Sequence, residues 1–524
     1  MDKWHILTKL TKTTMIQPCS ASQKQRIVIV GGGTAGWLTA AIVAAKHKIA
    51  KGECALDITL VEASDIPTVG VGEGTWPTMR NTLKDIGLSE KDVFRKCSAT
   101  FKQGGKFVNW VHGNGDFYYH PFTVPLGYGR IELAPYLDDI SHFATSVNFQ
   151  QHVCEKNLAP RTLSDNEYSS AQSNYAYHLD AGAFADMLRT FCKEELGVKH
   201  LVATVDGITK EGSDSIGSIT LNNGDTLHAD LFVDCSGFRS LLLGQTLGED
   251  VTSTSDVLFN DTALALHVPY EEDYEIKPYT QATAQEAGWI WDIGLTSRRG
   301  VGHVFSSRFM GEDEACNTLM NYVGDTHKDL SPRVIKFESG YRKTLWKGNC
   351  VAVGLAAGFV EPLEATALML IEISARYIAE QMPMPASAAP VVSKRFNKQM
   401  NYRWQRIIDF LKLHYVLTNR QEPYWLANKD PQTIPDSLKE DMEIWRYRGP
   451  QIADFSAAIE LFPAASYQYV LYGMGFSPDF SLHGHLNNLG PTATSLLNQN
   501  QLITEQKMQA LPNHRDYIEQ WLSA

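Results

Sequence analysis

The sequence lacks a long apolar segment. Among its 524 residues the most apolar stretch is CVAVGLAAGFV at 350–360. This is much shorter than the roughly 20 residues that a membrane-spanning helix requires. The first 23 residues mix charged residues with threonines and lack the unbroken apolar core of a secretion signal. We therefore expect a soluble, cytoplasmic protein with no membrane segment and a flexible extension over residues 1–23.

A basic region and a cysteine pattern are also missing. The formal net charge is -12, and no stripe dense in Lys and Arg is present, so we expect no nucleic acid partner. The eight cysteines are scattered without a C-x-x-C pair, which is typical of buried thiols in a reducing compartment. His483 and His485 stand close together but have no acidic neighbour, so we assign no metal.

A glycine loop directly follows the first predicted strand. QRIVIVGGGTAGWLTAAIVAAK (25–46) reads as strand, G-x-G-x-x-G turn and helix, and ALDITLVEAS (55–64) reads as the next strand, ending in an acid. Such glycines let the backbone approach a pyrophosphate at a helix N-terminus, and the acid accepts ribose hydroxyls. The residues assigned to the dinucleotide on these grounds are Gly31, Gly33, Thr34, Ala35, Gly36 and Glu62.

The loop alone does not separate FAD from NAD. A further strand with a Ser-Gly turn at 225–240 is of the kind that closes over FAD, and another strand is predicted within 348–364. Together they favour an α/β fold, with a Rossmann-like FAD-binding domain of the flavin monooxygenase type over 24–384. From residue 385 to 524 apolar residues recur at helical spacing, which predicts a mainly helical C-terminal module.

The stretch GLAAGFVEPLEATALMLIE (354–372) places three glutamates in an otherwise apolar run. Pro362 suits a first helical turn, so we predict that a helix starts there. We interpret Glu361 and Glu372 as structural residues, each with a cap or a buried partner. Glu364 has two interpretations: a first-turn residue that complements the helix dipole, or a buried carboxylate that stabilises a cation and takes a proton.

Several strings resemble the flavin-dependent tryptophan halogenase family. They are VGGGTAGW (30–37), VGVGEGTWPT (69–78), TFKQGGKFVNW (100–110), YHLDAGAFADML (177–188), GWIWDIGL (288–295) and FVEPLEAT (359–366). The resemblance implies a halogenase that uses reduced FAD, oxygen and a halide ion, bromide or chloride, to make hypohalous acid. That oxidant then reaches an electron-rich arene such as indole.

The resemblance also implies roles for residues near the flavin. Gly72 and Glu73 belong to the loop that covers the cofactor, and the backbone amides of Thr366 and Ala367 bind the halide. Lys102 holds hypohalous acid by a hydrogen bond or forms a haloamine from it. Without the resemblance, the sequence favours a surface lysine whose stem is buried, and the resemblance reverses that preference.

Further roles concern the aromatic substrate. By resemblance Glu364 is the catalytic carboxylate, His120 and Phe122 stack on the substrate ring, and Trp289 and Trp291 keep the substrate away from the flavin. The alternatives are a satisfied core histidine at His120 and core packing for the two tryptophans.

Two departures from the family pattern stand at Gly294, where the family has proline, and at Ala365, where it has serine. The segment 445–476 also lacks the pattern with which the family grips free tryptophan. We therefore expect indole, another arene or a residue on a larger carrier as the substrate. The alternatives are an aromatic flavin hydroxylase and a non-catalytic flavin-binding protein. The resemblance implies a separate flavin reductase as partner and, by analogy, allows a homodimer.

Overall fold

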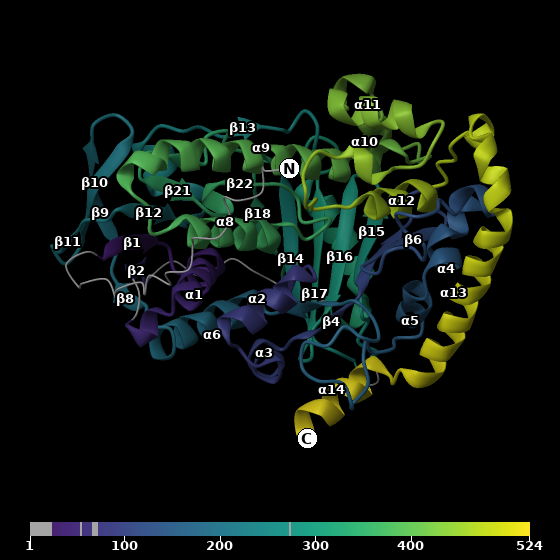
Figure 1. Ribbon diagram of the computed structural model, residues 1–524, viewed down its shortest axis with the longest axis horizontal. Helices are drawn as coiled ribbons and strands as arrows, with labels where there is room; N and C mark the ends of the chain where they lie inside the picture. The colour runs from purple at the N-terminus through teal and green to yellow at the C-terminus, as the bar shows by residue number, and fades with distance from the viewer. Residues whose placement is uncertain (1–23, 53–54, 65–71, 272–273, 328) are drawn as a thin grey trace, which may run out of the picture.

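The structure, a computed structural model, describes residues 24–52, 55–64, 72–271, 274–327 and 329–524. The extension predicted over residues 1–23 and the start of the 69–78 loop lie outside the described residues. Figure 1 shows a mixed α/β molecule with one sheet toward the left end of the longest axis and a second sheet in the middle.

A six-stranded sheet carries the glycine loop (Figure 1). All neighbouring strands pair in parallel except the edge strand β20, which is antiparallel. The four strands predicted from the sequence all belong to it, which confirms the α/β prediction. In order across the sheet the strands are β20 (Trp346–Lys347), β21 (Cys350–Ala352), β12 (Leu231–Asp234), β1 (Gln25–Val30), β2 (Leu56–Glu62) and β8 (Lys199–Val202).

A seven-stranded sheet forms the middle of the molecule. Its strands β16 and β17 are buried along their whole length, because the sheet is covered on both faces. Only the pair β15 and β5 is parallel. In order the strands are β18 (Arg333–Lys336), β14 (Thr262–Val268), β17 (Arg299–Phe305), β16 (Gly288–Gly294), β15 (Thr280–Gln285), β5 (Gly104–Val108) and β6 (Phe117–Pro121).

Three small sheets complete the strands. The first brings Lys102 beside the loop that was predicted to cover the flavin, since β3 and β4 both pair with β7. The sheets contain β3 (Glu73–Gly74), β7 (Ala176–Leu179) and β4 (Thr100–Lys102); β11 (Thr226–Leu227), β10 (Ser215–Leu221) and β9 (Val205–Glu211); and β13 (Thr252–Ser253), β19 (Gly340–Tyr341) and β22 (Gly358–Phe359).

The helices before the C-terminal region surround the glycine loop and the sheets. Helix α1 follows the loop and packs against α6 and α8. These helices are α1 (Thr34–His47), α2 (Thr78–Ile86), α3 (Glu90–Cys97), α4 (Phe143–Val147), α5 (Gln150–Glu155), α6 (Ala181–Glu194), α7 (Glu312–Val323) and α8 (Ala367–Gln381).

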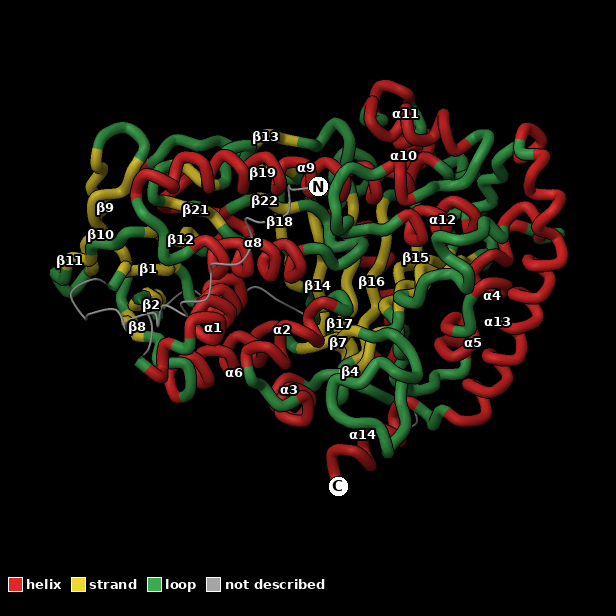
Figure 2. Tube along the Cα trace, viewed as in Figure 1, coloured by secondary structure: helices red, strands yellow, loops and turns green. Residues whose placement is uncertain are grey.

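The C-terminal region is mainly helical, as predicted, and the boundary predicted at residue 384 falls between α8 and α9. Figure 2 shows these helices in red along the top and right-hand edge of the molecule, except α14, which lies at the bottom. Of the residues that the structure describes, none belongs to a helix long and apolar enough to cross a bilayer. The helices are α9 (Ala389–Val416), α10 (Pro423–Asn428), α11 (Asp436–Trp445), α12 (Ala464–Gly473), α13 (Gly490–Ala510) and α14 (His514–Ser523).

The helix start predicted at Pro362 is wrong. Helix α8 begins at Ala367, and residues 361–366 form a loop in which the amide of Ala365 donates to the carbonyl of Pro362 at 3.0 Å. Ala365 has φ = 53°, a left-handed conformation that cannot continue a right-handed helix. Glu364 is therefore not a first-turn residue, which removes the helix-dipole interpretation of its role.

A buried ion pair fixes the C-terminal helix to the rest of the fold. Nη1 of Arg161 lies 2.6 Å from Oε2 of Glu90, and both side chains are fully buried. Nε of Arg161 donates to the hydroxyl of Tyr517 at 2.7 Å, and its guanidinium lies 4.4 Å from the ring of Trp521 in α14. Tyr177 of β7 donates to the same glutamate at 2.7 Å. The pair thus links α3, α14 and the small sheet that carries Lys102.

Replacing Arg161 by methionine is expected to lower the free energy of unfolding by about 3–5 kcal/mol, because Glu90 is left buried without its cation. Denaturant unfolding measures the loss. The control is Lys96→Met, which removes an exposed ion pair with Asp92 and should change stability by less than about 0.5 kcal/mol. Equal effects of the two substitutions would contradict the assignment.

Candidate functional site

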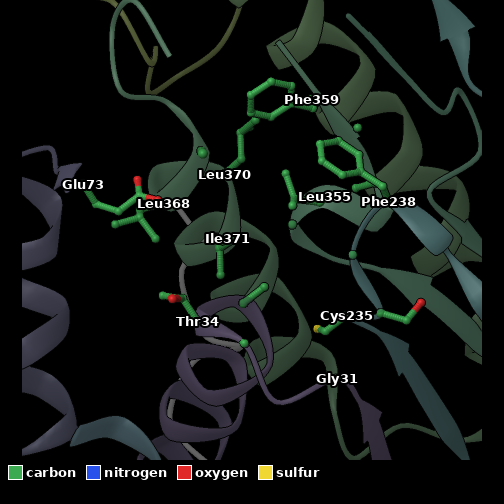
Figure 3. Close-up of a pocket in the computed structure, with 18 of the residues that line it drawn as sticks. Gly31, Thr34, Glu73, Cys235, Phe238, Leu355, Phe359, Leu368, Leu370 and Ile371 are labelled. Atoms are coloured by element: carbon green, nitrogen blue, oxygen red, sulfur yellow. The ribbon is translucent and has the colours of Figure 1, made fainter. Parts of the chain in front are cut away.

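A cavity of about 410 Å³ lies where the glycine loop, the end of β2, the Ser-Gly turn after β12 and the start of α8 meet. In Figure 3, Thr34 and Glu73 lie on one side of this space, and Phe238 and Phe359 lie on the other. Gly36 does not line the cavity. The other residues predicted to surround the cofactor and the halide do, namely Gly31, Gly33, Thr34, Ala35, Glu62, Gly72, Glu73, Thr366 and Ala367.

The glycine loop leaves room for phosphate groups. A Cβ on Gly31 would lie 2.1 Å from the carbonyl oxygen of Cys235, so only glycine fits where the loop passes the next strand. A Cβ on Gly36 would lie 1.9 Å from the carbonyl oxygen of Gly31, which assigns Gly36 to packing. Among the described residues, no atom lies within 4 Å of a Cβ built on Gly33, and the first turn of α1 contains no acidic residue. The helix N-terminus is therefore open to an anion.

Glu62 ends β2 at the edge of this cavity. Its Oε2 atom is buried and lies 2.9 Å from Nε2 of His200. Burial lowers the pKa of His200, so this imidazole is neutral. A carboxylate at the end of this strand and at the edge of the cavity suits a ribose hydroxyl, and the residues present therefore fit an adenine dinucleotide.

Lys102 ends β4 at the edge of the same cavity. Its side chain is 4% exposed, and Nζ lies 5.2 Å from the centre of the Phe122 ring. Burial lowers the pKa of Lys102 to about 8, while the charge of Glu364 acts in the opposite direction. The interpretation of Lys102 as a surface residue is wrong, because the pairing of β4 with β7 places its whole side chain in the interior.

Glu364 is buried in the loop 361–366 beside two histidines. Its Oε1 atom lies 2.9 Å from Nδ1 of His120 and 3.3 Å from Nε2 of His414. Burial by itself raises the pKa of this carboxyl, but the two histidines outweigh it and lower the pKa to about 2. Glu364 is therefore ionised, and Nδ1 of His120 carries the hydrogen that it accepts.

Glu361 and Glu372 have the buried partners that were predicted for them. Glu361 accepts hydrogen bonds from Asn260 at 2.5 Å, from Trp289 at 2.8 Å and from Tyr415 at 2.9 Å. Glu372 of α8 accepts from two threonines of α2. Burial raises the pKa of Glu361, and it raises that of Glu372 to about 7. Glu361 thereby ties the loop to β16 and α9.

Aromatic side chains from distant segments surround Glu364. Trp76 donates from Nε1 to the carbonyl of Glu364 at 2.7 Å, and its ring centre lies 5.4 Å from that of Phe122 and 5.3 Å from that of Phe462. His120 lies 5.9 Å from Trp76 and bonds through Nε2 to Ser466 at 2.9 Å. His120 and Phe122 thus flank Trp76 together.

Sequence reasoning did not select Trp76, His414, Phe462 or Ser466 as site residues. Trp76 could have been found, since it stands in the string VGVGEGTWPT. The other three come from α9, α12 and the loop before α12, and no local pattern marks them.

Trp289 and Trp291 lie on one face of β16, two residues apart. Trp291 lines the cavity, and Trp289 is buried behind it with its Nε1 bonded to Glu361. A Cβ on Gly302 would lie 2.1 Å from the Trp291 ring, so a glycine in β17 lets this ring lie flat on the sheet. The pair joins the cavity wall to the loop that carries Glu364.

Thr366 precedes the first residue of α8, and Ala367 is that first residue. Both line the cavity, and the first turn of this helix of 15 residues contains no acidic side chain. The first amides of a helix have no partner within it and attract anions. One end of α8 therefore faces the cavity with positive partial charge.

His483 and His485, to which the sequence analysis assigned no metal, have ring centres 5.7 Å apart.

The sequence matches the tryptophan halogenase family over residues 26–486. It is 34% identical over 488 residues to tryptophan 7-halogenase RebH of Lentzea aerocolonigenes, covering 87% of this chain and 90% of that protein. It is 34% identical over 474 residues to tryptophan 6-halogenase SttH of Streptomyces toxytricini, covering 86% and 89%. A solved tryptophan halogenase from Shewanella frigidimarina superposes with a TM-score of 0.91 at 43% identity, covering 96% of this chain and 98% of that one.

Replacing Glu361 by alanine is expected to lower the free energy of unfolding by about 3 kcal/mol, because three buried donors lose their shared acceptor. Glu361→Gln keeps an acceptor oxygen and should cost about 1 kcal/mol. Denaturant unfolding of both variants gives the values. Glu440→Ala, at an exposed position, is the control. If Glu361→Ala were no worse than Glu440→Ala, the loop would not depend on this carboxylate.

Proposed function

This chain belongs to the tryptophan halogenase family, and we propose that it uses Lys102 and Glu364 to halogenate indole or a similar neutral aromatic ring. It is a flavin-dependent halogenase that uses FAD and a halide ion. The observation that carries the proposal is that a buried lysine lines the cavity fitted to the dinucleotide, while a buried glutamate held by two histidines lies in the loop 361–366 that borders this cavity.

The residues around the cavity would hold the cofactor and the halide. The glycine loop and the N-terminus of α1 receive the pyrophosphate, Glu62 accepts from the ribose, and Gly72 and Glu73 cover the flavin. The free amides at the start of α8 receive the halide ion. Bound FAD in its reduced form supplies the electrons that, with oxygen and the halide, yield hypohalous acid. Bromide and chloride fit these amides equally, because both are monovalent anions.

Lys102 takes the next step. Its ammonium group lies at the edge of the cavity, where burial strengthens any hydrogen bond that it donates. We assign it as the donor to the oxygen of hypohalous acid, with haloamine formation as the alternative that a pH profile separates. By holding the oxidant, Lys102 directs it toward the aromatic residues around Glu364.

Glu364 completes the substitution. When the ring attacks the halogen, it becomes a cation that must lose a proton, and an ionised carboxylate in a buried site both stabilises that cation and accepts the proton. The hydrogen bond from His120 holds the carboxylate in place. Trp76, Phe122 and Phe462 provide aromatic faces for a flat ring.

A neutral substrate is favoured over free tryptophan by the segment 445–476. All four charged side chains of this segment already have partners: Arg446 pairs with Glu443, Arg448 with Asp454, and Glu460 with Tyr402. Arg446 is mostly exposed and the other three are held by partners within the fold, which disfavours their use for the ammonium and carboxylate groups of an amino acid. Indole, a substituted arene or a residue on a larger carrier therefore fits better.

A separate flavin reductase is the partner that we propose. The sequence contains one G-x-G-x-x-G loop, which the FAD site uses, so reduced flavin would be made elsewhere. Oxidation of added NADH by the purified protein alone would contradict this.

The test of the function is mass spectrometry of indole and tryptophan incubated with the protein, FAD, a flavin reductase, NADH, oxygen and bromide or chloride. We expect an indole product with the halogen isotope pattern, reduced by about 100-fold or more in Lys102→Ala while reduced FAD is still consumed. Tryptophan turned over as well as indole would refute the neutral-substrate proposal. An oxygenated product without halogen would indicate a hydroxylase.

The pH dependence of halogenation separates the two roles of Lys102. Since the pKa of Lys102 is about 8, the ammonium predominates below that pH, and the rate should fall as the pH rises through about 8. Glu364, with a pKa of about 2, stays ionised and adds no loss on the acid side down to about pH 5. Single-turnover rates between about pH 5 and 9.5 measure this. A rate that rises through pH 8 would indicate a neutral amine and hence a haloamine.

A further inference from the structure

Three segments converge at Gly74, next to the end of the cavity. A Cβ built on Gly74 would lie 3.2 Å from Nζ of Lys102, 3.3 Å from Cβ of Ala365 and 3.6 Å from Oγ1 of Thr280. Thr280 is the first residue of β15, is partly exposed and lines the same cavity as Lys102. Its hydroxyl therefore lies on the same side of Gly74 as the lysine ammonium, and the roles assigned so far leave it unused.

His178 determines the direction in which this hydroxyl bonds. The hydroxyl of Thr100 donates its single hydrogen to the carbonyl of Gly294 at 2.6 Å, so it can only accept from Nδ1 of His178, 3.5 Å away. This contact favours the tautomer in which Nδ1 of His178 carries the ring hydrogen. Nε2, which lies 2.8 Å from Oγ1 of Thr280, then has only a lone pair, and Thr280 must donate to it.

The protonation of His178 agrees with this direction. Its ring is fully buried on β7, and burial, followed by the nearby charges of Lys102 and His514, lowers its pKa well below the usual range. A neutral ring holds one hydrogen, at Nδ1. Because the hydrogen of Thr280 points to His178, the remaining lone pairs of its oxygen are available to the cavity.

We propose that the Thr280 oxygen accepts a hydrogen bond from the hydroxyl group of hypohalous acid, while Lys102 donates a hydrogen bond to the oxygen of the same molecule. The molecule HO–X offers one hydrogen and one oxygen with lone pairs, and this acceptor and this donor match both. His178 is a positioning residue that acts through Thr280. The inference rests on the proposed function and deepens it, since it names a second residue that holds the oxidant.

The step balances with these groups alone. The π electrons of the ring form the C–X bond as the O–X bond breaks, so the ring is oxidised and the halogen is reduced. The oxygen of hypohalous acid keeps its own hydrogen, which was hydrogen-bonded to Thr280. It takes a proton from Lys102 and leaves as water. The ring proton passes to Glu364, and its return to Lys102 restores both groups.

The test compares Thr280→Val, which has the same shape without the hydroxyl, with Thr280→Ser, which keeps it. The control is Thr283→Val on the same strand, because Thr283 is buried and does not line the cavity. For each protein, the aryl halide formed per reduced FAD consumed is measured. Free hypohalous acid is measured in the same reaction with a diketone trap that is rapidly halogenated. Thermal unfolding and FAD binding establish that each variant is folded.

We expect Thr280→Val to form at least about fivefold less aryl halide per reduced FAD, with more halogenated trap. Thr280→Ser should stay within about twofold of the original protein, and Thr283→Val should match it. An unchanged product ratio in Thr280→Val, an equal loss in Thr280→Ser, or loss of FAD consumption would overturn the proposal. Absence of halogenated product from the unsubstituted protein would instead refute the proposed function.

Discussion

Buried carboxylates on and beside the loop 361–366 set the conditions for the rest of the site. Removing a carboxylate from water is costly, and each one here is compensated in a different way. Glu361 has three neutral donors, Glu372 has hydroxyl donors, and Glu364 lies between two histidines. Burial raises the pKa of Glu361 and Glu372 by more than their donors lower it, whereas the two histidines bring the pKa of Glu364 below its usual value. Of these three carboxylates Glu364 is the one with a lowered pKa, which is why the proposed function assigns the role of base to it.

The same loop separates two environments. On one side is the cavity with the glycine loop and the start of α8, which suits a dinucleotide and an anion. On the other side are Trp76, Phe122 and Phe462 around Glu364, which suit a neutral ring. Lys102 reaches the boundary from β4, and Gly74 leaves space for its Nζ atom. In the proposed function, an oxidant made on the first side is used on the second without contact between flavin and ring.

Features that are set by residues close together in the sequence could be predicted from the sequence. The strand, glycine turn and helix at 25–46 and the acid at Glu62 were predicted because their spacing is local and their backbone geometry follows from it. The family resemblance supplied Lys102 and Glu364, whose chemistry no local pattern fixes. The predicted helix start at Pro362 failed because Ala365 adopts a left-handed conformation in a loop held by distant partners. Those partners, such as Trp289 and Tyr415, are brought together only by the folded sheets.

The most direct test of the account separates formation of the oxidant from its use. Glu364→Gln keeps the size of the side chain but removes the charge that takes the ring proton. Reduced FAD consumption, trapped hypohalous acid and aryl halide are measured together in this variant. The account predicts that the first two persist while aryl halide falls by about 100-fold or more. Aryl halide at the original level, or loss of all three, would contradict a site in which Lys102 holds the oxidant and Glu364 completes the substitution.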